Sequence, residues 1–186
     1  MSHNAIIEDL IMAFDMAPVG MLVSRQRRVQ SHNQAFCEIF GYAPNSLLGA
    51  SLECLYPSHD EFQHIGERAF LAMKDKGTYA DDRIMRKFNG SLFWCHVSGR
   101  AIDREDPFAA AVWVFEDISY ARPVTTDLTA REREIAQFLV SGKSSKQIAM
   151  GLNISHRTVE AHRARLMRKF DVKTTSELIA MLIGRP

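Results

Sequence analysis

The sequence is poor in cysteine and has no long apolar run. Its 186 residues include three cysteines, Cys37, Cys54 and Cys95, whose spacing forms no CxxC pair. This excludes a disulfide framework, gives no sign of a zinc site, and fits a reducing cytoplasm. No run of about 18 apolar residues occurs, so we expect no membrane span. Residues 1–14 carry acids and lack a basic segment before an apolar one, so they do not predict a signal peptide.

The short motifs that mark common enzymes are also missing. The sequence contains no Gly-rich phosphate loop, no GxSxG, no HExxH and no pattern of paired acids that indicates a catalytic cleft. The sequence therefore predicts a protein that is not an enzyme and holds no catalytic metal.

What is present is an uneven distribution of charge. The net charge of the chain is +1. Residues 1–121 contain 11 Lys+Arg against 16 Asp+Glu, a net charge of −5. Residues 122–186 contain 12 Lys+Arg against 6 Asp+Glu, a net charge of +6. Only the basic part is suited to replace counterions on phosphates, so the two parts are expected to do different work.

The first 120 residues predict an α+β domain with one antiparallel sheet. Apolar residues at helical spacing predict helices at residues 4–14, 34–40, 45–48 and 61–74. Asn33 is suited to cap the second helix and Gly41 to end it. Apolar alternation predicts strands at residues 21–23, near 29, and at 78–88, 92–102 and 109–116. Asn89-Gly90 predicts a hairpin, because both residues tolerate positive φ.

The last third predicts four helices after a short linker at residues 121–127. Thr129 with Glu132, and Ser144 with Gln147, have the spacing of capping boxes, and Ser155 is a third cap. The helices are expected at residues 129–140, 144–152, 155–170 and 176–183.

The third of these helices has two distinct faces. At 100° per residue, one face gathers the side chains expected in the core: Val159, His162, Leu166 and Phe170. The opposite face gathers Arg157, Glu160, Ala161, Ala164 and Arg168, with Arg163 and Arg165 beside it. Small alanines let such a helix approach base edges, and arginines reach guanine edges or phosphates.

Residues 128–184 resemble the LuxR/FixJ-type helix-turn-helix domain of bacterial transcription regulators. The resemblance rests on LTxRExE, GxSxKxIA, ISxRTVExHR and MxKF, all present in order. It implies that the third helix reads double-stranded DNA and that the fourth forms a dimer seam. The DNA-binding residues it indicates are Lys143, Ser144, Lys146, Arg157, Thr158, Glu160, Ala161, His162, Arg163, Ala164, Arg165, Arg168 and Lys169. Glu160 either accepts a bond from a cytosine amino group or orients an arginine, and the sequence leaves both open.

Residues 8–121 resemble a PAS sensory domain. The resemblance rests on segments in the expected order: APVG at 17–20, NQAF at 33–36, FGY at 40–42, LG at 48–49, RKFNGSLFW at 86–94 and VFEDIS at 114–119. It implies a sensor or dimerisation domain that takes a small-molecule or protein signal. Alternation along the strands places the expected pocket on one sheet face, at Met85, Phe93, Cys95, Val97, Trp113 and Phe115. These side chains either line that pocket or fill the core. Trp94 points to the other face and needs a cover, from the N-terminal helix or a second subunit.

The PAS resemblance does not identify a cofactor. Flavin-binding PAS domains (LOV domains) carry a nucleophilic cysteine where this chain has Leu52, and polar amides where it has Cys95 and Phe115, so a flavin photoadduct is disfavoured. Haem is also disfavoured, since His64 lies well upstream of the histidine of haem-binding relatives. The chain is compatible with no cofactor at all.

These features predict a cytoplasmic, homodimeric, sequence-specific transcription regulator, with residues 1–120 as PAS domain and 128–186 as helix-turn-helix domain. A shift in PAS packing would reposition the two recognition helices. The phosphorylated receiver domain that often precedes this output is absent from the sequence pattern. The alternative is a regulator whose two domains bind a partner protein and not DNA.

Overall fold

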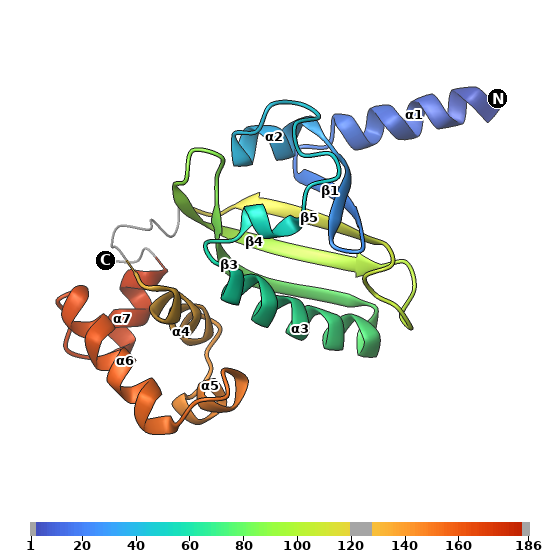
Figure 1. Cartoon of the computed structure of the whole chain (residues 1–186). Coiled ribbons are helices and arrows are strands. Elements are labelled where there is room, and N and C mark those ends of the chain that lie inside the picture. The colour runs from blue at the N-terminus through green and yellow to red at the C-terminus, as the bar shows by residue number, and fades with distance from the viewer. Residues whose placement is uncertain (1–2, 120–127, 184–186) are drawn as a thin grey trace.

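The computed structural model describes residues 3–119 and 128–183 (Figure 1). A five-stranded antiparallel sheet with strand order β2-β1-β5-β4-β3 forms its first part. The strands are β1 (Gly20–Arg25), β2 (Arg28–His32), β3 (Thr78–Arg86), β4 (Leu92–Ala101) and β5 (Ala111–Asp117). The helices around the sheet are α1 (His3–Asp15), α2 (Gln34–Phe40), the 3₁₀ turn η1 (Leu52–Leu55) and α3 (His59–Lys76).

Four helices follow, as the sequence predicts: α4 (Ala130–Val140), α5 (Ser145–Gly151), α6 (His156–Lys169) and α7 (Thr175–Leu182). The expected fold class, an α+β sheet domain followed by a helical domain, is confirmed. The expected linker at residues 121–127 lies outside the described residues.

Local side-chain chemistry fixes the helix ends. The Asn33 side chain accepts a hydrogen bond from the backbone N–H of Phe36, and Gly41 ends α2 with a φ of +75°. Both predicted capping boxes form, Thr129 with Glu132 and Ser144 with Gln147, each satisfying N–H groups that the first helical turn leaves unpaired.

Two local features differ from the sequence-based expectations. Residues 44–49 form turns and not a helix, and Asn45 there has a φ of +64°, which interrupts helical geometry. The 3₁₀ turn η1 was not predicted, because a four-residue element carries too little periodicity. The hairpin predicted at Asn89-Gly90 is confirmed, since β3 and β4 pair on either side of it; of the two turn residues only Gly90 takes positive φ (+85°), and its N–H donates to the Lys87 carbonyl.

The inner face of the sheet carries the larger part of the first core. Phe93, Cys95 and Val97 of β4 join Trp113 and Phe115 of β5 in one buried cluster covered by α2, η1 and α3. The predicted division of β4 into two faces is therefore confirmed, since Trp94 belongs to a different cluster.

Because Gly99 has no side chain, the Trp113 ring packs directly against the backbone of β4 on the inner face of the sheet. A Cβ at Gly99 would lie 2.5 Å from Trp113 Cε3 and 2.7 Å from Met73 Cε. Because both neighbours are buried, Gly99→Ala is expected to lower the free energy of unfolding by about 1–3 kcal/mol. Urea denaturation checks this, with Ser98→Ala on the opposite sheet face as the matched control. Equal midpoints for the two variants would contradict this packing.

The part of the outer sheet face around Trp94 is covered by the helical domain of the same chain. Ile84 of β3 and Trp94 of β4 are buried in one apolar cluster with Leu128 and with Ile135 and Phe138 of α4. The expectation that α1 or a second subunit covers Trp94 is therefore wrong: α4 and its neighbours provide the cover. The sequence around Trp94 does not show whether α1, a second subunit or α4 covers it, because each offers an apolar helix face.

Helix α1 extends away from the rest of the structure (Figure 1). Its side chains Leu10, Ile11 and Met12 are 65%, 62% and 57% exposed. Within the described residues, no helix is long and apolar enough to cross a membrane. In the same ranges no group of three or more His, Cys, Asp or Glu side chains is placed to hold a metal ion.

Candidate nucleic-acid interface

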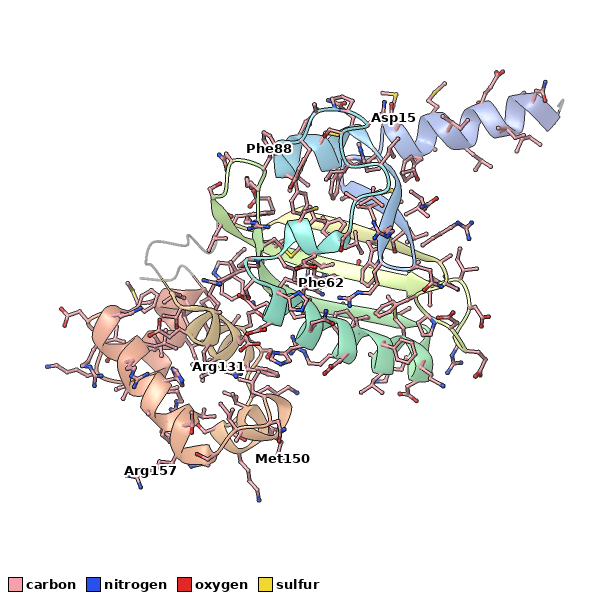
Figure 2. All side chains as sticks on the ribbon, viewed as in Figure 1. Asp15, Phe62, Phe88, Arg131, Met150 and Arg157 are labelled. Atoms are coloured by element: carbon pink, nitrogen blue, oxygen red, sulfur yellow. The ribbon has the colours of Figure 1, made fainter. Side chains whose placement is uncertain are left out.

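Helix α6 presents a basic surface with small side chains at its centre. Ala161 and Ala164 are exposed, and Arg157, Arg165 and Arg168 are exposed around them. Figure 2 shows Arg157 near the free end of the helical domain, on the side away from the sheet. The opposite side of α6 holds it in place, because Val159 and Leu166 are fully buried. This surface combines phosphate-reaching cations with room for a close approach.

Four further polar residues expected on this surface lie at the starts of α5 and α6. Lys143, Ser144 and Lys146 are exposed around the start of α5, where Ser144 is the cap. Thr158 is exposed in the first turn of α6, and its hydroxyl lies 2.8 Å from the Ser155 hydroxyl. The structure thus places them at two helix starts, and Lys143 also lines a pocket between the helical domain and the sheet, together with Arg68 and Asp82.

Arg163 is directed inward. Its Nη1 donates to Ser145 Oγ at 2.5 Å and to Glu160 Oε1 at 2.7 Å, and its Nη2 contacts the Thr175 hydroxyl. It therefore ties α5, α6 and α7 together in this structure. Hydrogen bonds from Ser145 and Arg163 lower the pKa of Glu160, with the Ser145 bond the larger cause. Of the two open roles of Glu160, orienting an arginine is the one present in this DNA-free geometry.

Lys169 is also paired. Its Nζ donates to Glu132 Oε2 at 2.7 Å, joining the end of α6 to the capping box of α4. Burial alone would raise the pKa of Glu132, but the bonds from Lys169 and Thr129 lower it below its ordinary value. Lys169 thus links the recognition helix to α4.

His162 is half-buried, contrary to the fully buried position expected from the helical wheel. Its Nδ1 makes no hydrogen bond to any described residue. Burial, followed by the nearby Arg165 charge, lowers its pKa from 6.5. Neutral imidazole is therefore the form present at pH 7, so His162 supports the helix without adding a cation.

A lowered histidine pKa makes stability depend on pH. Below pH 6.5 the unfolded chain binds a proton that folded His162 resists, so this contribution to stability is complete above 6.5 and falls as the pH decreases toward the folded pKa. His162→Gln is expected to reduce the loss of urea resistance between pH 7.5 and pH 5.5. The control is His59→Gln, since His59 is exposed on α3. An unchanged pH dependence in His162→Gln would refute this role.

The six expected pocket residues come together inside the sheet domain, and four of them line a small cavity. Met85, Val97, Trp113 and Phe115 border a cavity of about 20 Å³, with Leu52, Leu55, Tyr56 and Arg83. Phe93 and Cys95 are buried in the same cluster. Such a volume holds about one water molecule, so these side chains largely fill the core in this structure.

Arg83 and Asp81 in this region were not selected from the sequence. Strand alternation places both on the same face of β3 as Met85. Two charged residues on an otherwise apolar face were therefore the feature of the sequence that could have identified them. The Arg83 side chain is 1% exposed, and its Nε donates to Asp81 Oδ1 at 2.6 Å.

A second group of missed residues joins the two domains. Arg133 of α4 donates from Nη2 to Glu61 Oε1 of α3 at 2.7 Å, and Glu61 is fully buried. His64 Nδ1 lies 2.7 Å from Glu134 Oε1, and Arg131 donates to the other Glu134 oxygen at 2.9 Å. His64 thus contacts α4, which is not the position of a haem ligand in the inner cavity.

Comparisons with known proteins cover both parts of the chain. The family model of bacterial regulatory proteins of the luxR family matches residues 126–182, and a PAS domain model matches residues 18–119. The sensor protein TdiS of Thauera aromatica is 33% identical over 117 residues, which are 63% of this chain and 21% of TdiS. The chain therefore spans about a fifth of the length of that relative.

The solved structures similar to this chain include the two that follow. The PAS domain of a LuxR-family transcriptional regulator from Burkholderia thailandensis, in complex with ethanol, is 48% identical, with 64% of this chain and 99% of that chain covered and a TM-score of 0.57. The VqmA dimer of Vibrio cholerae, a LuxR-type receptor in the absence of its target DNA, is 20% identical, with 95% of this chain and 88% of that chain covered and a TM-score of 0.56. The second likeness concerns the fold alone.

Proposed function

Because the chain belongs to the PAS domain family and carries a helical domain of the luxR family of bacterial regulatory proteins, we propose that it is a DNA-binding transcription regulator under PAS control. The observation that carries the proposal is the exposed face of α6, where Arg157, Arg165 and Arg168 surround Ala161 and Ala164. A cationic, small-residue helix face suits the major groove, because the arginines reach phosphates and base edges.

Each expected contact residue has a proposed role. Arg157, Ala161 and Ala164 approach bases, while Arg165 and Arg168 meet phosphates. Lys143, Ser144, Lys146 and Thr158 contact the backbone from the starts of α5 and α6. Glu160, Arg163 and Lys169 hold α6 in place through the contacts described above, and His162 supports the helix as a half-buried neutral side chain.

We propose domain limits of 1–120 and 128–186 with a linker at 121–127, and a cytoplasmic location where DNA is accessible. The sheet domain senses a small molecule or a partner through the cavity near Met85, Val97, Trp113 and Phe115. The ethanol complex of the 48% identical PAS domain supports a small ligand.

The active form proposed is a homodimer. The exposed apolar side chains of α1 supply a surface that a second copy would cover, because Leu10, Ile11 and Met12 face solvent in the single chain. Two copies would present two α6 helices to half-sites about one DNA turn apart.

Selection from a pool of random duplexes tests the function. The purified full chain is expected to enrich a palindromic sequence that it binds as a dimer, with affinity falling steeply as salt increases. Gel-shift titration and native mass measure this. An unenriched pool, with no binding above that of random DNA, would overturn the proposal and favour a protein partner.

A further inference from the structure

A surface groove beside the β1–β2 turn contains a positively charged side chain without a carboxylate partner. The groove has a volume of about 380 Å³ and is lined by Arg27 of the turn, by α3 and by the loop that joins β4 to β5. Arg27 is half-buried there. Its Nη2 donates to the Phe62 carbonyl at 2.7 Å, and no described residue forms an ion pair with it. Burial lowers the pKa of Arg27, as expected for a cation whose charge is not fully balanced.

Strained backbone holds Arg27 in this groove. Gln26 and Arg27 have φ values of +48° and +58°, in the left-handed region that residues other than glycine rarely adopt. The Gln26 N–H donates to the Phe108 carbonyl at 2.7 Å, and the Arg27 carbonyl accepts from the Leu52 N–H at 2.9 Å, so the turn is fixed on both sides. Gly66 makes room for the guanidinium, because a Cβ there would lie 2.7 Å from Arg27 Cζ. Strain of this kind is concentrated at binding sites.

The walls of the groove suit an apolar side chain with an acid beside it. The Phe70 and Phe108 rings meet edge to face with their centroids 5.4 Å apart, and both are half-buried. The carboxylate among the lining residues belongs to Glu67, which is exposed to solvent, so screening weakens its repulsion of an incoming acid. A carboxylate that reaches Arg27 would balance a charge that the chain itself leaves without a partner.

Helix α1 of the same chain has a matching surface. At 100° per residue Ile7, Leu10 and Ile11 share one face, Glu8 lies at its edge and Asp9 lies on the opposite face. All five residues are exposed, and Glu8 forms no ion pair with a described residue. Since α1 extends away from the rest of its own chain, it does not cover its own groove (Figure 1).

We propose that α1 of one copy docks in this groove of a second copy, and that Glu8 pairs with Arg27 across the interface. The inference rests on the homodimer proposed above and names the surface that covers α1. Each chain has one such helix and one such groove, so two copies related by a two-fold axis satisfy both contacts and leave neither open to a third copy. The ion pair sets the orientation of the helix, because a reversed helix would leave Arg27 without its acid.

The uncovered part of the outer sheet face is the other surface that a second copy could use. Arg100, Val112 and Val114 line a hollow there. Arg100 is exposed, and an exposed cation gains little from a salt bridge because water already solvates it. The half-buried Arg27 gains more from a carboxylate, so the charges favour the groove.

Sedimentation of the full chain without DNA tests the charge pair. Glu8→Lys is expected to raise the dimer dissociation constant at least about tenfold, because two cations then meet across the interface. Asp9→Lys makes the same change on the opposite helix face and is expected to leave the constant unchanged. Glu8→Lys/Arg27→Glu exchanges the two charges and is expected to restore the dimer.

Three results would overturn the pairing: a wild-type chain that stays monomeric, equal dissociation constants for Glu8→Lys and Asp9→Lys, or a folded double variant that fails to dimerise. If the double variant does not fold, the comparison of Glu8→Lys with Asp9→Lys decides the question, because both positions are exposed.

Photo-crosslinking identifies the docking surface. Benzophenone-alanine at position 10 is expected to crosslink to segments that contain Phe70 or Phe108 of the partner subunit, whereas the same group at position 9 is expected to give none. Crosslinks from position 10 to β4 or β5 would place α1 on the outer sheet face and refute the inference, leaving the homodimer and the regulator function in place. A dimer with the expected crosslinks that enriches no DNA sequence would refute the regulator function alone.

Discussion

In the Arg133→Met variant, α4 is expected to separate from α3, with a loss of docking free energy of about 3–5 kcal/mol. The Glu61 carboxylate is fully buried, and Arg133 is its cationic partner. Removing Arg133 leaves a buried charge without compensation, whereas the methionine retains most of the volume.

Trp94 reports the separation. It is 2% exposed because the helical domain covers it, and the other tryptophan, Trp113, is buried inside the sheet domain. Acrylamide is therefore expected to quench about half of the tryptophan emission in the variant. The double variant Glu61→Leu/Arg133→Met removes both charges and is expected to restore protection. Equal protection of Trp94 in wild type and Arg133→Met would contradict a docking role for the pair.

The variant should also show a stronger pH dependence than the wild type, with the same sign. Burial raises the pKa of Glu61 above 4.5, and Arg133 opposes that rise. Without Arg133, the Glu61 carboxyl takes up a proton more readily while α4 is packed on α3. The free-energy cost of burying the ionised carboxylate is therefore absent below pH 4.5 and grows as the pH rises to the raised pKa. Trp94 in Arg133→Met is thus expected to become more accessible as the pH increases from 4.5.

Replacing Arg157, Arg165 and Arg168 together by alanine is expected to remove most DNA binding. Each lost phosphate contact lowers the slope of log affinity on log salt by about 0.9, so affinity near 0.15 M salt should fall by on the order of 100-fold per subunit. The three side chains are exposed, so the helical domain should remain folded. Fluorescence anisotropy against the selected duplex at several salt concentrations measures both quantities.

Arg163→Ala is the matched control for that variant. Arg163 joins Ser145, Glu160 and Thr175 within the domain, so its removal is expected to reduce thermal stability and to leave the salt slope unchanged. A slope that falls as much with Arg163→Ala as with one of the exposed arginines would mean that Arg163 turns outward to DNA. An unchanged affinity of the triple variant would favour a protein partner.

The sequence predicted the elements whose signals are local. Caps such as Asn33, Thr129 and Ser144 bond backbone groups within three residues, so their spacing is visible in the chain. The exposed face of α6 was equally visible, because helical periodicity separates Ala161 and Arg168 from the core.

The contacts between the domains were not visible in the same way. Glu61 and Arg133 lie 72 positions apart, and each alone has the pattern of an ordinary surface residue on an amphipathic helix. The inward turn of Arg163 also depends on partners from two other helices, Ser145 and Thr175. Only the tertiary arrangement shows that these charged groups are buried or shared.

The most direct test of the account places a photo-crosslinking residue on α6. Benzophenone-alanine at position 161 of the full chain, bound to the selected duplex, is expected to crosslink to bases inside the enriched sequence. The same group at position 71, where Leu71 of α3 is 68% exposed on the sheet domain, is expected to give no crosslink. Crosslinking from position 71, or its absence from position 161 in a complex that does form, would contradict the claim that α6 reads DNA.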